Sequence, residues 1–240
     1  MGNSEAEKQM RIGKFPRVAL FDLDGTLLDS APDMLVTANR MRDERGLGAV
    51  SLAELRPHVS KGSRAMLAIA FPHLETVERE ALVPEFLEIY RQELGQHSQL
   101  FDGVDAMLSA LEDAGSLWGI VTNKPEYLAR DILPQLGWES RCAVLIGGDT
   151  LAEKKPHPLP LQVAAQRIGV AVEDCVYVGD DERDIVAARA ARMPSIAALW
   201  GYRQAGERPE EWGADVLYEL PYDLIEPAAW PSCGVVVGAT

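Results

Sequence analysis

The stretch VALFDLDGTLLDS at residues 18–30 contains a short apolar run that ends in two carboxylates, Asp22 and Asp24. The run Val18–Phe21 predicts a buried strand, and the glycine and threonine that follow allow a sharp turn. Side chains at i and i+2 of an extended chain point the same way, so both acids emerge at the carboxyl end of the strand, where open α/β sheets bind ligands. Such acids repel each other, so they share a proton or hold a cation. A bare pair of this kind also occurs in turns after edge strands, but the whole stretch favours a site.

Further apolar runs at residues 117–121 and 175–178 also end in polar residues. Weaker strand patterns lie at residues 143–146, 195–199 and 216–218. Segments of helical period separate these runs, with apolar residues at i, i+3, i+4 and i+7. This alternation predicts an α/β fold with a Rossmann-like parallel sheet flanked by helices.

Residues 31–97 differ from the rest because they contain amphipathic stretches and no convincing strand. Ser51 and Glu54 have the spacing of a helix capping box. We therefore expect residues 31–97 to form an all-helical cap domain, inserted into an α/β core of residues 16–30 and 98–240. Residues 1–15 are expected to be a disordered tail. The apolar stretch Val235–Val237 has no role that the sequence assigns.

The composition restricts the classes of partner. The 240 residues carry a formal charge of −14, which repels nucleic acid and anionic membranes, so we expect neither as a partner. No apolar run is long enough to span a bilayer, and the first residues lack the apolar core of a secretory signal. Three widely spaced cysteines, Cys142, Cys175 and Cys233, support no disulfide framework, so we expect a cytoplasmic protein. Monomer and homodimer both stay open.

A second group of acids, Asp180, Asp181 and Asp184, follows the run at residues 175–178. Aspartates at the start of a helix also serve as N-caps. Together with Asp22 and Asp24, however, they bring four or five carboxylates to one edge of the sheet, a concentration of charge that needs a divalent cation. Hard oxygen ligands without His or Cys favour Mg²⁺ over zinc.

Phosphate-binding groups are expected at the same edge. Thr122 and Asn123 end the run at residues 117–121, and Lys155 lies in the string KKPHP at residues 154–158. A hydroxyl and backbone N–H groups suit phosphoryl oxygens, while a lysine from a separate loop offsets the carboxylates.

The strings FDLDGTLLDS, VTNKP, KKPHP and VGDDERD resemble, in this order, the four motifs of the haloacid dehalogenase-like phosphohydrolases. The resemblance covers residues 16–225 and implies a two-step phosphoryl transfer. Asp22 would be the nucleophile, and Asp24 would protonate the leaving group and then accept a proton from water. Mg²⁺ would be held by Asp22, the backbone carbonyl of Asp24, and Asp180.

The same resemblance assigns roles to the remaining motif residues. Thr122, the backbone of Asn123, and Lys155 would bind the phosphoryl oxygens, because the family's lysine directly precedes proline. Asp184, with Asp181 beside it, would orient a water bound to the metal. Lys154 is then expected to be a surface charge.

The helical cap would close over the cleft and select the leaving group. Its short basic loop, Lys61, Gly62, Ser63 and Arg64, would suit a phosphate ester that carries a carboxylate, although the loop also resembles a solvated helix start.

Strings such as IGGDTLAEKKPHP resemble phosphoglycolate phosphatases, and GSRAMLAIAF and EEWGADVL resemble N-acetylmuramic acid 6-phosphate phosphatases. The implied substrate is a small phosphorylated metabolite, with the second ester slightly favoured. A β-phosphoglucomutase-like mutase of the same fold and a non-catalytic metabolite-binding protein stay open as alternatives.

Overall fold

The computed structural model describes residues 14–233. Most of the expected tail at residues 1–15, and the whole of Val235–Val237, lie outside the described residues. Within them, Phe15 packs its ring against Trp230, with the ring centroids 6.3 Å apart. None of the helices in residues 14–233 combines the length and the apolar character that crossing a bilayer requires.

A six-stranded parallel sheet forms the centre of the larger layer. Its strands, in spatial order, are β5 (Cys142–Ile146), β4 (Leu117–Val121), β1 (Val18–Phe21), β6 (Cys175–Gly179), β7 (Ser195–Ala198) and β8 (Val216–Tyr218). The α/β fold predicted from the sequence is therefore confirmed, and each of the weaker strand patterns forms a strand.

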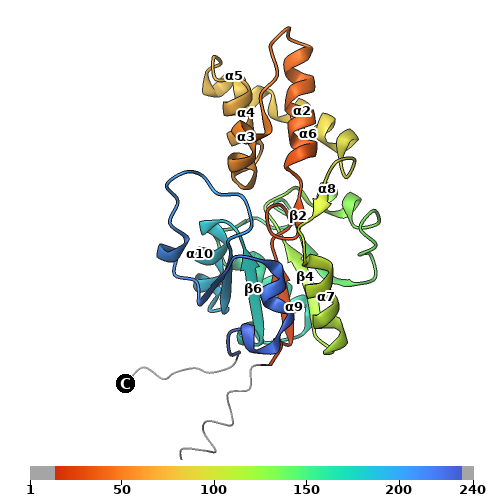
Figure 1. Cartoon of the computed structure of the whole chain (residues 1–240), viewed down its shortest axis with the longest axis vertical. Coiled ribbons are helices and arrows are strands. Elements are labelled where there is room, and N and C mark those ends of the chain that lie inside the picture. The colour runs from red at the N-terminus through yellow and green to blue at the C-terminus, as the bar shows by residue number, and fades with distance from the viewer. Residues whose placement is uncertain (1–13, 234–240) are drawn as a thin grey trace, which may run out of the picture.

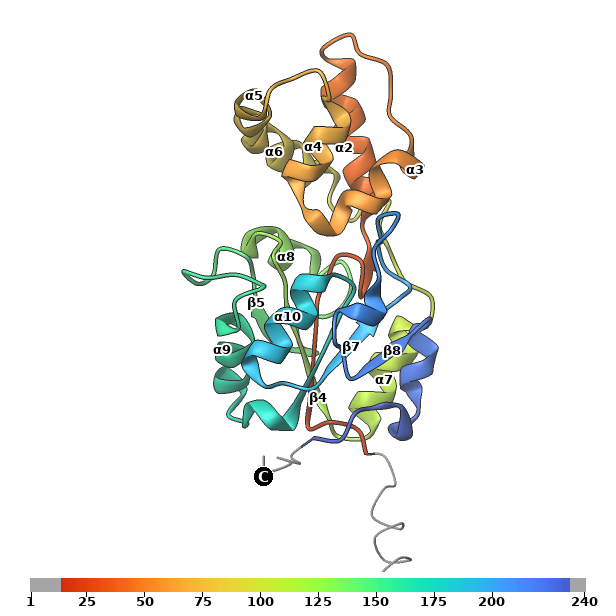
Figure 2. The same cartoon turned by 90° about the vertical axis from the view of Figure 1, so that its left-hand side faces the viewer.

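Helices cover both faces of this sheet (Figures 1 and 2). They are α7 (Val104–Asp113), α8 (Glu126–Ile132), α9 (Leu159–Ile168) and α10 (Glu182–Ala191). Ala19 and Phe21 of β1 belong to the same apolar cluster as the buried face of α7, whereas Val18 and Leu20 belong to the cluster that contains α9 and α10. Both faces of β1 are thus buried, which explains its uninterrupted apolar sequence.

The remaining helices gather at one end of the molecule, beyond the carboxyl ends of the central strands (Figure 2). They are α2 (Ala31–Asp43), α3 (Leu52–Leu55), the 3₁₀ helix η1 (Arg56–Lys61), α4 (Ser63–Ala70), α5 (Thr76–Ala81) and α6 (Val83–Glu93). Helix α3 begins with the predicted capping box, in which Glu54 N–H donates to Ser51 Oγ and Ser51 N–H donates to the Glu54 carboxylate. Residues 31–93 form a helical layer without a strand.

Two short antiparallel strands join this helical layer to the sheet. The chain enters it through β2 (Leu28–Asp29) and returns through β3 (Gln99–Leu100). Beside them, the fully buried carboxylate of Asp33 accepts hydrogen bonds from the N–H groups of Gly95 and His97, at 2.7 and 2.6 Å, and from the hydroxyl of Ser98. Asp33 therefore fixes the returning segment against the first turn of α2.

We predict that Asp33→Ala lowers the free energy of unfolding by about 2–3 kcal/mol, because it leaves buried N–H donors without an acceptor. Urea unfolding followed by circular dichroism measures the change. The matched control is Asp43→Ala, an exposed position of the same helix, which should change stability by less than about 0.5 kcal/mol. Equal effects of the two variants would contradict the assigned role of Asp33.

Candidate active site

Three neighbouring strands bring the predicted site residues to one edge of the sheet. β1 lies between β4 and β6 with parallel register, Phe21 being paired with Ile120 and with Val178. The residues that follow these strands, Asp22, Thr122 and Asp180, therefore meet at the carboxyl edge.

A buried acid cluster lies at this edge. Asp22, Asp180 and Asp184 each offer a carboxylate oxygen, and these oxygens lie within 4.8 Å of one another. Burial, together with the charges of Asp22 and Asp184, raises the pKa of Asp180 well above its ordinary value. The pKa of Asp184 is raised to about 6, mainly by burial, although the neighbouring Lys155 opposes the shift.

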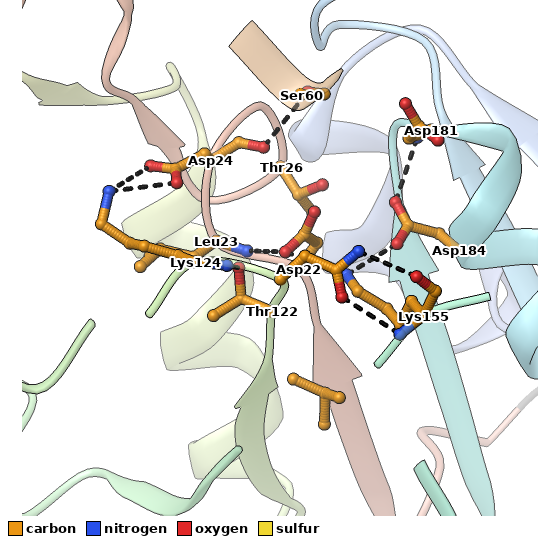
Figure 3. A network of polar contacts seen from close by, with 12 residues as sticks. Asp22, Leu23, Asp24, Thr26, Ser60, Thr122, Lys124, Lys155, Asp181 and Asp184 are labelled. Atoms are coloured by element: carbon orange, nitrogen blue, oxygen red, sulfur yellow. Dashed lines mark hydrogen bonds and ion pairs between the residues drawn. The ribbon is translucent and has the colours of Figure 1, made fainter. Parts of the chain in front are cut away.

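Lys155 supplies the positive charge that the cluster needs. Its Nζ lies 3.0 Å from Asp22 Oδ1 and 2.7 Å from Asp184 Oδ1, and it donates to the hydroxyl of Tyr177 at 2.7 Å (Figure 3). Burial alone would lower the pKa of Lys155, but the charges of Asp184 and Asp22 raise it, so the ammonium stays charged. Lys155 is therefore the counter-ion of the acid cluster, in contact with the predicted nucleophile.

Asp180 is held by donors from three separate segments. It accepts hydrogen bonds from the Thr26 hydroxyl at 3.0 Å, the Ser60 hydroxyl at 2.7 Å and the Tyr202 N–H at 3.0 Å. Gly25, with φ of +91°, lies so close that a Cβ there would fall 2.2 Å from Asp180 Oδ2. The turn after β1 therefore requires glycine for both its backbone conformation and its close approach to Asp180.

The carboxylate of Asp24 lies outside this cluster and has its own lysine. Lys124 Nζ lies 3.0 Å from each oxygen of Asp24, on the opposite side of the site from Lys155 (Figure 3). The same ammonium donates to the hydroxyl of Tyr90 at 2.5 Å and lies 4.4 Å from the centre of its ring. Because Tyr90 belongs to α6, this contact links Asp24 to the helical layer.

The backbone carbonyl of Asp24 points to the other side, toward the acid cluster. It lies 3.5 Å from Ser60 Oγ, the hydroxyl that donates to Asp180. The carbonyl and the carboxylate of Asp24 therefore contact different neighbours.

Asn123 ties two loops together at the carboxyl edge. Its side chain donates to the carbonyl of Lys155 at 2.9 Å and accepts from the N–H of the same residue at 3.1 Å. The hydroxyl of Thr122 accepts the N–H of Lys124 at 3.2 Å and lines the cleft described below. The side chain of Asn123 thus positions Lys155, and both of its polar atoms are used in doing so.

Asp181 is the N-cap of α10. Its carboxylate accepts from the N–H of Arg183 at 3.0 Å, and Asp184 accepts from the N–H of Asp181 at 3.0 Å. Burial alone would raise the pKa of Asp181, but the hydrogen bonds and charges of Arg183 and Lys61 outweigh it and lower the value to about 2. Asp181 is not part of the metal-ligand group, whereas Asp184 is both a capping residue and a member of it.

A cleft of about 350 Å³ separates the sheet edge from the helical layer. Asp22, Asp24 and Thr122 form its base. Its roof is mostly apolar and includes Met34, Val59, Met66, Phe86, Leu87 and Tyr90. The base can act on a charged group while the roof contacts the remainder of a ligand.

The basic loop predicted to contact a substrate lines this cleft, with Lys61, Gly62, Ser63 and Arg64 all in its wall. Lys61 is already paired, since its Nζ lies 2.8 Å from Asp181 and 2.6 Å from Glu207. Arg64 pairs with Glu80 at 2.6 Å. The loop therefore supplies two cations that each have a carboxylate partner.

Sequence reasoning missed three polar side chains of the site: Ser60, Tyr90 and Lys124. Lys124 belongs to the string VTNKP, so its place directly after a strand end was a usable signal. Ser60 and Tyr90 lie on the helical layer, 120 and 34 residues away from the partners they contact, and no local pattern marks them.

The acid cluster suits a hard divalent cation. All the donors are carboxylate oxygens, and the pKa of Asp180 is raised by burial and by neighbouring carboxylates, whose repulsion a cation would relieve. Asp22 and Asp180, with the nearby carbonyl of Asp24, offer such an ion a set of oxygen donors.

Comparison with known proteins agrees with this geometry. The family model described as haloacid dehalogenase-like hydrolase matches residues 19–198. A protein from Xanthomonas campestris named phosphoglycolate phosphatase is 72% identical over 91% of this chain and 99% of its own length. One from Pseudomonas aeruginosa, named N-acetylmuramic acid 6-phosphate phosphatase, is 40% identical over 91% of this chain and 96% of its own length. A crystal structure of a predicted phosphoglycolate phosphatase from Haemophilus somnus superposes with a TM-score of 0.78 at 26% identity, covering 88% of this chain and 97% of that one.

We predict that Lys155→Met lowers the free energy of unfolding by about 3–5 kcal/mol, because it leaves buried carboxylates without their counter-ion. Adding a divalent cation should restore part of the loss. Chemical unfolding with and without Mg²⁺ measures both effects. Lys14→Met, at an exposed position that precedes β1, is the control and should change little. Unchanged stability of Lys155→Met would refute the counter-ion role.

Proposed function

The chain belongs to the haloacid dehalogenase-like hydrolases, and from this we propose that it hydrolyses the phosphomonoester of a small metabolite through a phosphorylated Asp22. The observation that carries the proposal is the carboxylate of Asp22 at the base of the cleft, 3.0 Å from the ammonium of Lys155. A buried carboxylate beside a fixed cation is a suitable nucleophile and acceptor for a phosphoryl group.

In the first step, an oxygen of Asp22 forms a bond to phosphorus while the ester P–O bond breaks. The leaving alkoxide takes the proton of the Asp24 carboxyl group. Asp24 lines the cleft beside Asp22, and Lys124 fixes its orientation through both carboxylate oxygens. The hydroxyl of Thr122, the backbone of Asn123, and Lys155 bind the phosphoryl oxygens.

In the second step, the carboxylate of Asp24 takes a proton from water, whose oxygen attacks phosphorus. The bond between phosphorus and Asp22 breaks, which releases inorganic phosphate and restores the Asp22 carboxylate. Asp24 thus serves first as acid and then as base, and the two steps leave the protein unchanged.

The metal of this proposal is Mg²⁺. Asp22, the carbonyl of Asp24, and Asp180 would hold it, and Asp184 stands beside them, 2.7 Å from Lys155. When bound, the ion offsets the negative charge of the phosphoryl group and of the acids that surround it.

We assign residues 31–97 as the cap domain that covers the cleft. The roof residues from α2, η1, α4 and α6 support this assignment, because they exclude water above the reacting group. The loop at residues 61–64 would then form the wall of the cleft beside the leaving group.

For the substrate, the cleft favours N-acetylmuramic acid 6-phosphate over 2-phosphoglycolate. A volume of about 350 Å³ is within the range of pockets that enclose larger ligands. The apolar side chains of Phe86, Met34 and Met66 can contact the carbon atoms of a larger ligand. A two-carbon ester offers them almost no apolar surface. The 72% identity to a protein named phosphoglycolate phosphatase supports the smaller ester as the second candidate.

We further propose a cytoplasmic location and a monomer or homodimer. Cys142, Cys175 and Cys233 are free thiols, which suits a reducing compartment.

We predict that the protein hydrolyses p-nitrophenyl phosphate with Mg²⁺, and that EDTA abolishes the activity. Asp22→Asn should reduce kcat by at least about a thousandfold, because the amide cannot accept the phosphoryl group. Phosphate release measures turnover, and circular dichroism checks the fold. Substantial activity of the folded variant would overturn the nucleophile assignment. Isomerised sugar phosphate with little free phosphate would instead indicate a mutase, and no turnover of any phosphoester would indicate a binding protein.

We also predict that kcat/KM for N-acetylmuramic acid 6-phosphate exceeds that for 2-phosphoglycolate by at least about tenfold, since burying the equivalent of two methylene groups supplies such a factor. Steady-state kinetics on both esters, with the same enzyme preparation, measures the ratio. A ratio below one would make 2-phosphoglycolate the better substrate and would refute the argument that the apolar roof selects the larger ester.

A further inference from the structure

The cations in the cleft wall differ in one respect, which is whether they have a carboxylate partner. Lys61 pairs with Asp181 and Glu207, Arg64 with Glu80, Lys124 with Asp24, and Arg183 with Asp181. Lys154 also lines the cleft and is exposed. Among residues 14–233, it is the one cleft-lining cation without a carboxylate at ion-pair distance.

Hydrogen bonds tie the segment that contains Lys154 to the loop that follows β4. The next residue, Lys155, exchanges two hydrogen bonds with the side chain of Asn123, and its Nζ reaches Asp22. In the same segment between β5 and α9, the N–H of Gly148 donates to the carbonyl of Lys124 at 2.8 Å. Lys154 therefore lines the cleft directly before a residue that contacts Asp22.

A free cation here is unusual because the protein as a whole is acidic, with a formal charge of −14. Asp149 also lines the cleft, but its carboxylate accepts the N–H of Glu126 at 2.7 Å. Lys155 and Lys124 are occupied with the acids at the base of the cleft. An anionic group of the substrate distant from its phosphate would therefore find its partner in Lys154.

We infer that Lys154 is a specificity-determining residue that binds a second anionic group of the substrate, a carboxylate, so that the enzyme selects phosphomonoesters that carry one. The inference rests on the proposed function. It also assigns Lys154 a role that differs from the surface charge expected from the sequence. The exposed position suits the role, because a lysine at the mouth of the cleft can reach the outer end of a ligand whose phosphate lies at the base.

The test compares two esters that differ only in the lactyl ether that carries this carboxylate. N-acetylmuramic acid 6-phosphate carries a carboxylate on its lactyl ether, and N-acetylglucosamine 6-phosphate has a hydroxyl at the same place. We expect the wild-type enzyme to prefer the first ester in kcat/KM. Lys154→Gln should lower that preference by about fivefold to tenfold, through KM of the carboxylated ester, and Lys154→Arg should retain most of it.

Two further variants sharpen the result. Lys14→Gln removes an exposed positive charge before β1 and should keep the wild-type preference. Arg64→Gln removes the rival cation of the cleft wall, whose partner Glu80 is itself exposed. An unchanged preference in Lys154→Gln would overturn the inference, as would a loss of preference in Arg64→Gln alone.

The two levels of the proposal fail in different ways. If the wild-type enzyme hydrolyses neither ester nor p-nitrophenyl phosphate, the proposed function is wrong and the inference falls with it. If it hydrolyses both sugar phosphates with equal kcat/KM, the proposed function stands and the role of Lys154 is refuted.

Discussion

The site depends on the ammonium of Lys155, which lies between the carboxylates of Asp22 and Asp184. Buried acids repel one another and lose their hydration, so a cluster of this kind is stable only with positive charge inside it. A single lysine cannot balance three carboxylates, which leaves room for a divalent cation. The parallel register of β1 and β6 enforces the crowding, because it places Asp22 and Asp180 after neighbouring strand ends. The strand register therefore creates the crowding of negative charge that Lys155 and a cation must balance.

A second lysine extends this constraint to the helical layer. Lys124 binds both oxygens of Asp24 and also contacts the hydroxyl and ring of Tyr90 on α6. A second contact of this kind joins the helical layer to the acid cluster, where the hydroxyl of Ser60 on η1 donates to Asp180. The lysine that orients Asp24, the proposed acid and base, is therefore itself held by a side chain of the helical layer. Contacts from Tyr90 and Ser60 thus tie the helical layer to both sides of the site.

The sequence predicted the parts of this arrangement that local patterns encode. Apolar runs that end in Asp22, Thr122 and Asp180 place those residues at one sheet edge, because all parallel strands point their carboxyl ends the same way. Ser51 and Glu54 likewise form the predicted cap of α3. Ser60, Tyr90 and the pairing of Lys61 with Glu207 depend on how the helical layer sits on the sheet. Such contacts join residues far apart in sequence, and periodicity carries no information about them.

In the proposed roles of the adjacent lysines, one loop would serve both ends of a substrate. Lys155 is buried and neutralises the acids around the nucleophile, whereas Lys154 is exposed in the cleft wall. The two side chains, although adjacent in sequence, thus differ in burial and in partners. The hydrogen bonds of Asn123 to the backbone of Lys155 hold both at once. Changing the outer lysine should therefore alter which esters bind while the inner one keeps the chemistry at Asp22 intact.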